Sequence, residues 1–343
     1  MKSKYIIIGS SATEDPKTHG GTTVLVSQIL EYFEKKEKDF IFIEAKKYEG
    51  KFAFIFNYFY VIGKLLLNIR KVDIIMVNVA SRGAYFLSPL VLFLSKMANK
   101  KFIFRMFGGN FITLYENSRG TKRKLISYVI KNANIMFFEP RYLVDRYAKI
   151  RPNVYWFPNI RKKPTVFRNP KRVYEKKVVY LGQIRETKGL DELLNAAKIL
   201  GDDYSFDLYG TLFDKKYNQS LLDEYSNVMY KGRVHNEKVY ETLARYDILV
   251  LPSYMEGYPG VLIEAFGVGL PVVSTELPSI KEMVDGSNGL LIEPKNVQQL
   301  IEAFKIFNVD NYPDFSKNAL NKFNDYEYES VYKNIISICE KEQ

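Results

Sequence analysis

The sequence predicts an α/β fold of two Rossmann-like, doubly wound domains that face a cleft. Short apolar, β-branched segments alternate with longer amphipathic segments, which is the pattern of parallel strands joined by helical crossovers. The same alternation begins again near residue 178. The chain of 343 residues is also long for a single hydrophobic core, and its 47% hydrophobic content is that of an ordinary folded protein.

Each half of the chain supplies its own set of elements. In the first half, a strand at 4–11 leads through a glycine-rich loop into a helix at 23–36. Further strands of this half are predicted at 39–45, 73–79, 101–107 and 133–139. Strands of the second half are predicted at 178–182, 205–210, 227–232, 247–253, 271–275 and 288–294. The helices predicted between them are 189–200, 236–246 and 260–269.

The segment "NVYWFPNIRKKPTVFRNPKR", residues 153–172, has the composition of a linker. It carries three prolines and many basic residues. We place the domain boundary between residues 160 and 172. The predicted organisation is a first domain at 1–160, a second at 161–325 and a C-terminal helical segment at 326–343.

The composition excludes several classes of protein. The single cysteine, Cys339, rules out an intramolecular disulfide framework, and His19 and His235 are too few for a structural zinc site. The first apolar run is too short for the core of a signal peptide. We therefore expect a cytoplasmic protein.

Positive charge is concentrated in the first half. Residues 1–160 hold 26 Lys and Arg against 12 Asp and Glu, whereas residues 161–343 hold 24 against 27. This asymmetry indicates an anionic partner for the first domain, either a membrane surface, nucleic acid or a phosphate-bearing substrate. Lysines that serve solubility alone are the simpler explanation.

An aromatic segment at 51–70, "KFAFIFNYFYVIGKLLLNIR", is too short to span a bilayer. Its apolar stretch with basic flanks suits a helix that lies in a membrane interface, and an ordinary core helix explains it equally well. A second basic cluster at 118–125, "SRGTKRKL", favours the membrane surface.

Two glycine-containing loops follow predicted strands, where open α/β sheets bind ligands. In the first, Gly20 and Gly21 precede a helix whose free N–H groups can face an anion, although a plain helix cap is the simpler explanation. In the second, Gly182 allows close backbone approach, and Arg185 and Lys188 suit a diphosphate. Solvated charge is the alternative for both basic residues.

The stretch "SYMEGYPGVLIEAFG", residues 253–267, places Glu256 and Glu264 around a turn and an apolar helix. A carboxylate one turn into such a helix needs hydrogen-bond donors to offset its desolvation. Ribose hydroxyls would supply them, and the free N–H groups around Gly260 and Val261 could hold a phosphate. A salt bridge to Glu264 on a half-exposed helix is the structural alternative.

These motifs resemble the retaining glycosyltransferases of the GT-B fold, in particular glycosyltransferase family four, whose hallmark is Glu-x7-Glu. The likeness covers nearly all of the second domain, from "LGQIRETKGLDELLNAA" through "GRVHNEKVYETLARYDILVLPS" and "YMEGYPGVLIEAFGVGLPVVST" to "VDGSNGLLIEP". In the first domain it rests on Gly20, Gly21 and "WFPNI". The C-terminal segment resembles the family's final helices, which cross back onto the first domain.

The resemblance implies a role for each candidate residue. Glu264 would bind the ribose, and Glu256 would contact the hydroxyls of the donor sugar. Lys188 would bind phosphate and, with Glu256, form the catalytic pair. Gly20 and Gly21 would approach the diphosphate from across the cleft. The remaining donor-binding residues would be Gly182, Arg185, Gly257, Tyr258, Pro259, Gly260 and Val261.

Two positions depart from the family pattern. The family's phosphate-binding arginine usually follows the glycine directly, and here that position is Gln183, with Arg185 as a substitute. Where many relatives have His-Gly beside the acceptor, this chain reads Phe107-Gly108-Gly109, so proton transfer falls to the leaving phosphate or another group. The family holds no catalytic metal, and we expect none.

The sequence therefore predicts a metal-independent, retaining hexosyltransferase without a cofactor. Its donor would be a UDP or GDP sugar, and its acceptor a glycan or polyprenyl-linked glycan of the cell envelope. It would act at the inner face of the cell membrane through the basic first domain. A GT-B nucleotide-sugar epimerase is the main alternative. A nucleic-acid-binding protein is disfavoured because no recognition motif accompanies the lysines.

Overall fold

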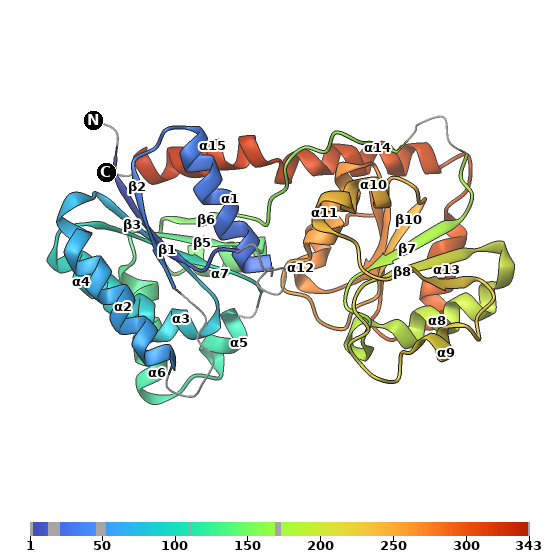
Figure 1. The fold of residues 1–343 in the computed structure, drawn as a ribbon, viewed down its shortest axis with the longest axis horizontal. Helices are drawn as coiled ribbons and strands as arrows, with labels where there is room; N and C mark the ends of the chain where they lie inside the picture. Colours follow the sequence, from blue (N-terminus) through green and yellow to red (C-terminus); the bar gives the residue numbers. More distant parts are fainter. Residues whose placement is uncertain (1–2, 13–20, 46–52, 110, 169–172, 342–343) are drawn as a thin grey trace. The chain divides into compact units, whose positions relative to one another are not determined.

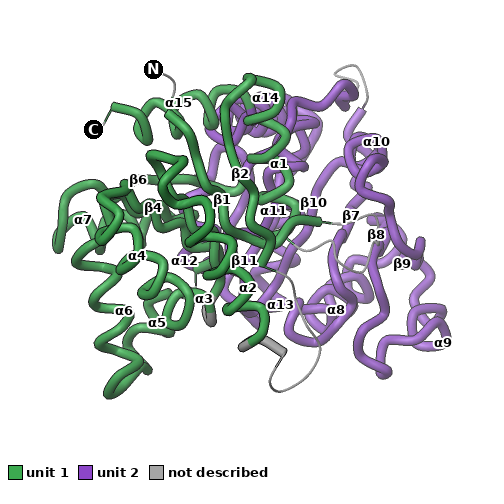
Figure 2. The backbone as a smooth tube through the Cα atoms, turned by 60° about the vertical axis from the view of Figure 1, so that its left-hand side comes forward, with its two compact units in different colours: residues 1–159, 329–343 green, residues 160–328 purple. Residues whose placement is uncertain are grey.

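A computed structural model describes residues 3–12, 21–45, 53–109, 111–168 and 173–341. The chain divides into two compact units, shown in Figure 2. Unit 1 comprises residues 1–159 and 329–343, and unit 2 comprises residues 160–328. Within the described residues, each unit contains a six-stranded parallel sheet with helices between its strands (Figure 1). The prediction of two doubly wound α/β domains is confirmed.

The sheet of unit 1 has the strand order β2-β1-β3-β4-β5-β6. Its strands are β1 (Tyr5–Gly9), β2 (Phe40–Glu44), β3 (Ile74–Val79), β4 (Lys101–Met106), β5 (Ile135–Phe138) and β6 (Val154–Trp156). The strands are rich in β-branched and aromatic residues. The four inner strands β1, β3, β4 and β5 are buried almost throughout, as expected for a parallel sheet covered on both faces, whereas the edge strands β2 and β6 are partly exposed. The order reverses between β1 and β3.

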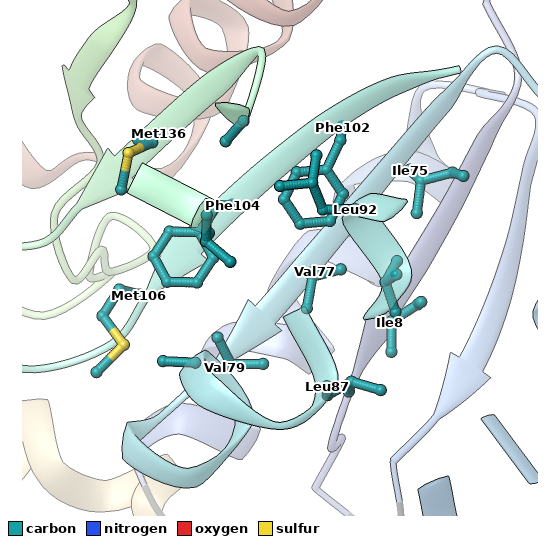
Figure 3. Packing of buried hydrophobic residues seen from close by; sticks show 14 of the residues in the cluster. Ile8, Ile75, Val77, Val79, Leu87, Leu92, Phe102, Phe104, Met106 and Met136 are labelled. Atoms are coloured by element: carbon teal, nitrogen blue, oxygen red, sulfur yellow. The ribbon is translucent and has the colours of Figure 1, made fainter. Parts of the chain in front are cut away.

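Helices cover both faces of this sheet. They are α1 (Gly21–Lys35), α2 (Ala53–Asn68), α3 (Ser81–Tyr85), α4 (Leu87–Met97), α5 (Phe111–Glu116), α6 (Gly120–Asn132), α7 (Arg141–Ala148) and α15 (Tyr328–Lys341). Residues of α2, α4, α6 and α7 join one buried cluster with alternate strand residues such as Val77, Phe102 and Phe104. Figure 3 shows this packing between β3, β4 and the helix that contains Leu92.

The opposite face of the sheet packs against α1 and α15. The ring of Tyr332 in α15 lies 4.8 Å from that of Tyr32 in α1, tilted by 31°, and meets the ring of Phe157 edge-on at 5.8 Å between centroids. Arg105 of β4 is completely buried on this face, with its guanidinium carbon 3.4 Å from the ring centre of Phe157. Burial lowers the pKa of Arg105, and the nearby Glu139 opposes that change. Aromatic faces thus surround a buried cation.

Cys339 lies in α15 and is fully buried. Burial raises the pKa of its thiol to about 12. Because the thiolate is the reactive form, we expect native Cys339 to react with an aromatic disulfide reagent roughly a hundredfold slower, or more, than in unfolded chain. Absorbance-monitored labelling with and without denaturant measures this ratio. Equal labelling rates in the native and unfolded protein would show that α15 does not hold the Cys339 thiol against the sheet.

The sheet of unit 2 has the strand order β12-β11-β10-β7-β8-β9. Its strands are β7 (Lys177–Leu181), β8 (Ser205–Tyr209), β9 (Val228–Tyr230), β10 (Ile248–Leu251), β11 (Val272–Thr275) and β12 (Gly289–Ile292). The chain runs outward from β7 to β9 and then returns to β10 on the other side of β7. The order therefore reverses between β7 and β10, where doubly wound sheets bind ligands beyond the strand ends.

The helices of unit 2 surround this sheet. They are α8 (Leu190–Leu200), α9 (Gln219–Leu222), α10 (Val239–Leu243), α11 (Gly260–Gly267), α12 (Pro278–Lys281), α13 (Val297–Ile306) and α14 (Tyr312–Phe323). A buried ion pair fixes the start of the unit to its sheet: Arg168 donates to Asp247 at 2.7 Å, and neither side chain is more than 4% exposed. The backbone N–H groups of Glu175 and Lys177 donate to the other oxygen of Asp247.

Two predicted elements differ from the structure. The segment 153–172 was expected to be a linker, yet Val154–Trp156 form β6, because Tyr155 and Trp156 pair with Phe137 and Phe138 of β5. The helix predicted at 236–246 is shorter: a 3-10 turn over Asn236–Lys238 precedes α10, which ends at Leu243.

Candidate functional site

The two loops that carry the main candidates leave adjacent strands of unit 2. Strands β7 and β10 are parallel neighbours, with Val178 opposite Ile248 and Val179 opposite Leu249. Their carboxyl ends lie at the same edge of the sheet, so the loop after β7 and the loop after β10 emerge beside each other. Two segments separated by about seventy residues thereby meet at the reversal of strand order.

Lys188 and Glu256 form an ion pair at this edge. Lys188 Nζ donates to Glu256 Oε1 at 2.6 Å, and the side chains are only 22% and 11% exposed. Ser253 Oγ donates to the same oxygen at 2.7 Å. Thr275 Oγ1 donates to the carbonyl of Ser253 at 2.5 Å and fixes the loop that carries it. A partly desolvated cation and carboxylate are therefore held in one place by a connected network.

Glycine makes the close approach of these two loops possible. Gly189 has a φ of +73°, and a Cβ atom there would lie 2.0 Å from the carbonyl oxygen of Pro252. The loops are also joined by a backbone hydrogen bond from Tyr254 to Thr187 at 3.0 Å. Any side chain at position 189 would push Lys188 away from Glu256, so the glycine positions the ion pair.

Tyr180 connects the second candidate cation to this network. Burial raises the pKa of its hydroxyl, Glu256 raises it further and Arg185 lowers it. The hydroxyl donates to the carbonyl of Gln183 at 2.7 Å, while Gln183 itself is exposed. Arg185 stacks on Phe213, with its guanidinium carbon 4.8 Å from the ring centre. The structure therefore brings Arg185, Lys188 and Glu256 into one neighbourhood.

Helix α11 begins directly after the turn that follows Glu256. Its N-cap residue is Pro259, whose side chain has no acceptor and so does not cap the first N–H groups. Uncapped N–H groups at a helix start favour an anion. The side chain of Tyr258 is buried, and its ring lies 6.3 Å from that of Tyr326. Because Tyr258 is buried and Gly257 and Gly260 have no side chain, this turn can contact a ligand only through its backbone at these three positions.

Glu264 has a protein partner. Arg161 Nε donates to Glu264 Oε1 at 2.6 Å, and both side chains are less than one-fifth exposed. Arg161 is itself held in place, because its N–H donates to Tyr326 and its carbonyl accepts from Tyr328. Arg161 therefore offsets the desolvation of Glu264 without any ribose hydroxyl. A carboxylate still has acceptor capacity beyond one guanidinium N–H.

The candidates of the first half lie in unit 1. Gly20 falls outside the described residues, and Gly21 is the first residue of α1. Phe107 is buried next to Arg105. The N–H of Gly108 donates to Glu139 Oε2 at 2.6 Å, so a titratable side chain does stand next to the Phe107-Gly108-Gly109 loop.

Sequence reasoning overlooked Ser253, Tyr180 and Arg161. Ser253 and Tyr180 could have been found, because each lies at or near the carboxyl end of a predicted strand beside a candidate residue. Arg161 could not, because 103 residues separate it from Glu264 and no local pattern indicates that pairing.

Two further observations concern ligands. Among the described residues, no group of three His, Cys, Asp or Glu side chains is arranged to hold a metal ion. A cavity of about 590 Å³ lies in unit 1, away from the candidate residues, and is lined mainly by Lys36, Lys38, Lys333, Lys341 and Glu340. Lys38 is already paired with Glu340 at 2.6 Å.

Residues 175–307 match the family model of glycosyl transferases group 1. The part of the chain that resembles this family therefore lies within unit 2. The match includes Gly182, Arg185, Lys188, Glu256 and Glu264, and so contains the ion pair and the start of α11. Unit 1 lies outside the matched residues.

One curated relative is the putative teichuronic acid biosynthesis glycosyltransferase TuaC of Bacillus subtilis. It is 35% identical over 125 residues, which are 36% of this chain and 31% of the relative. The chain thus matches about a third of that relative's length, and the likeness concerns only part of each protein.

Solved structures extend the likeness to the whole fold. Sucrose-phosphate synthase from Thermosynechococcus elongatus superposes with a TM-score of 0.77 at 15% identity, over 98% of both chains. HepE from Anabaena, solved in complex with UDP, gives 0.75 at 14% identity, over 98% of this chain and 99% of that chain. These neighbours confirm the predicted GT-B fold with its two Rossmann-like domains.

Proposed function

We propose that this protein is a retaining, metal-independent hexosyltransferase. It moves a sugar from a UDP or GDP donor to a glycan or lipid-linked acceptor in cell-envelope polysaccharide synthesis. The observation that carries this proposal is the Lys188–Glu256 ion pair at the reversal of strand order in unit 2, next to the uncapped start of α11. The names of the relatives, which include a teichuronic acid enzyme and a UDP complex, support the donor and the pathway class.

The chemistry follows from the charges. The bond between the anomeric carbon and the donor's phosphate oxygen breaks, and negative charge develops on the leaving diphosphate. Lys188, with Arg185 nearby and the first N–H groups of α11, would stabilise that charge. Glu256 would accept hydrogen bonds from the sugar hydroxyls. The new bond joins the acceptor oxygen to the anomeric carbon, and the acceptor proton passes to the leaving phosphate.

The decisive experiment combines binding and turnover. A thermal-shift screen against UDP and GDP sugars should identify a donor, because a ligand of the native state raises the melting temperature. The selected donor is then incubated with and without lipid-linked glycan acceptors. Transfer with retained anomeric configuration supports the proposal. Isomerised donor in the absence of acceptor would indicate an epimerase. A protein that binds nucleic acid but no nucleotide sugar would be a nucleic-acid-binding protein instead.

We expect Glu264→Gln to weaken nucleoside diphosphate binding by about tenfold to a hundredfold, because a charge-assisted hydrogen bond to ribose is lost. Titration calorimetry with UDP or GDP and its 2′,3′-dideoxy analogue isolates that contact. The native protein should distinguish the two ligands, and Glu264→Gln should not. If Glu264 serves only Arg161, the preference for ribose will be the same in both proteins.

We place the reaction at the cytoplasmic face of the cell membrane, where a lipid-linked acceptor is accessible. The basic first half supports this placement, with 26 Lys and Arg against 12 acids in residues 1–160. In the described part of the chain, every helix is too short or too polar to cross a bilayer.

A further inference from the structure

Helix α2 is apolar on both of its faces. Val61 and Leu65 are fully buried in the core of unit 1, as expected for a helix that covers a sheet. The opposite face exposes Phe56, Phe59 and Leu67, each by more than 70%. A helix that is hydrophobic all round is normally covered on every side. The face with Val61 and Leu65 is that of a core helix, whereas the face with Phe56, Phe59 and Leu67 suits a helix at a membrane interface.

Helix α4 shows the same feature. Phe86, Leu90, Phe93 and Met97 are all exposed and recur at the spacing of a single helix face. The other side of α4 is buried through residues such as Val91. Together these four side chains leave a row of large apolar surface exposed on unit 1, which is typical of an interaction site.

The two exposed rows belong to one surface. Both helices pack on the same face of the sheet of unit 1, and they lie next to each other in Figure 1. The ring of Tyr58 in α2 lies 6.2 Å from the ring of Phe86 at the start of α4. We call this surface the α2–α4 face; it consists of Phe56, Phe59, Tyr60, Leu66, Leu67, Phe86, Leu90, Phe93 and Met97.

The charges around the α2–α4 face are positive. Neither helix contains an acidic residue, and Lys64, Arg70, Lys71 and Lys96 lie on or at the ends of the two helices. Helix α6, which Lys96 contacts through Asn132, adds a basic first turn in "GTKRK". In the sequence from 51 to 115, Asp73 is the only acid. An apolar centre with a basic border is complementary to an anionic lipid surface.

We infer that the α2–α4 face is the surface by which unit 1 docks on an anionic lipid bilayer, with α2 and α4 lying in the headgroup region. A second copy of the chain fits the surface poorly. A two-fold interface would bring the basic residues of this border close to those of the second copy, and neither α2 nor α4 supplies an acid to compensate. The inference specifies the membrane part of the proposed function and is independent of the sugar chemistry.

The test is vesicle flotation with the full chain. Wild type should bind phosphatidylcholine vesicles that contain phosphatidylglycerol, and bind less at high salt. Phe59→Glu combined with Phe93→Glu should weaken that binding by about a hundredfold or more. The variant loses two aromatic rings that would insert into the bilayer, and it places two negative charges against the anionic lipid. Ile150→Glu is the matched control: Ile150 is also an exposed apolar residue of unit 1, but it lies outside the face, and binding should change less than about twofold.

A charge variant provides a second, milder test. Lys64→Ser combined with Lys71→Ser should weaken binding to phosphatidylglycerol vesicles by about tenfold and leave the fold intact. The melting temperature and its shift by UDP, both measured without vesicles, should be the same for all four proteins. A wild-type protein whose melting temperature shifts with neither UDP nor GDP would argue against the proposed donor, without affecting the vesicle result.

Three outcomes would overturn the inference. The first is a wild-type protein that does not bind phosphatidylglycerol vesicles. The second is a folded Phe59→Glu/Phe93→Glu protein that binds them as well as wild type does. The third is a wild-type dimer that this double variant dissociates, without vesicle binding, which would identify a second copy as the occupant.

Discussion

We expect Lys188→Met to lower kcat for sugar transfer by about a hundredfold to a thousandfold. Methionine preserves the length of the side chain and removes the positive charge that faces the leaving diphosphate. Lys188 is 22% exposed, so its charge acts in a partly desolvated site rather than in bulk water. Steady-state kinetics with the donor selected by the thermal-shift screen measure the effect.

Glu256→Gln tests the other half of the pair. We expect a comparable loss, because glutamine keeps the shape but accepts weaker hydrogen bonds from sugar hydroxyls. The double variant should lose less than the product of the two single losses, since Lys188 and Glu256 share a hydrogen bond of 2.6 Å.

Lys216→Met is the matched control for both variants. Lys216 also forms an ion pair in unit 2, with Asp191 at 2.8 Å, but its side chain is 43% exposed. Its loss should change kcat by less than about twofold, because surface pairs contribute little. Full activity in Lys188→Met and Glu256→Gln would refute the assignment of this edge as the catalytic site.

Asp247→Ala should give the largest loss of stability, about 3–5 kcal/mol in the free energy of unfolding. Asp247 is fully buried and accepts from Arg168 at 2.7 Å and from two backbone N–H groups at 2.9 and 3.0 Å. Alanine would leave a buried guanidinium without its carboxylate and two N–H groups without their acceptor.

Urea unfolding followed by circular dichroism measures this loss. Asp202→Ala is the control, because Asp202 is exposed and accepts one hydrogen bond from Ser226 at 2.7 Å. Its effect should stay within about 1 kcal/mol. If the two alanine variants unfold at the same urea concentration, the buried pair does not hold the start of unit 2 to its sheet.

The sequence predicts the sheets well because each strand carries its own signal. Strand β10, for example, is a continuous apolar run that ends at the loop before Glu256, and such runs identify buried parallel strands without further context. Lys188 and Glu256 could be assigned to the same edge for the same reason. Strand β6 is short and followed by prolines, so its local composition does not indicate a strand. Its conformation is determined by its pairing with β5.

Other features depend on contacts that are distant in sequence. The pairing of Glu264 with Arg161 brings the segment after β6 to helix α11, and nothing near either residue indicates it. The exposed face of α2 could not be predicted from local sequence either. Its sequence is apolar throughout, and only the packed structure shows which side chains meet the sheet and which remain exposed.

Helix α15 has a consequence for how the protein folds as it is made. Unit 1 needs Tyr332, Ile335 and Cys339 in its interior, yet these residues follow the whole of unit 2 in the chain. During synthesis, the strands of unit 1 emerge first and must wait with one face of their sheet partly uncovered. Unit 2 is continuous and can fold before that face is covered. We therefore expect unit 1 to depend on chaperones during translation, and unit 2 to be the part that can be produced alone.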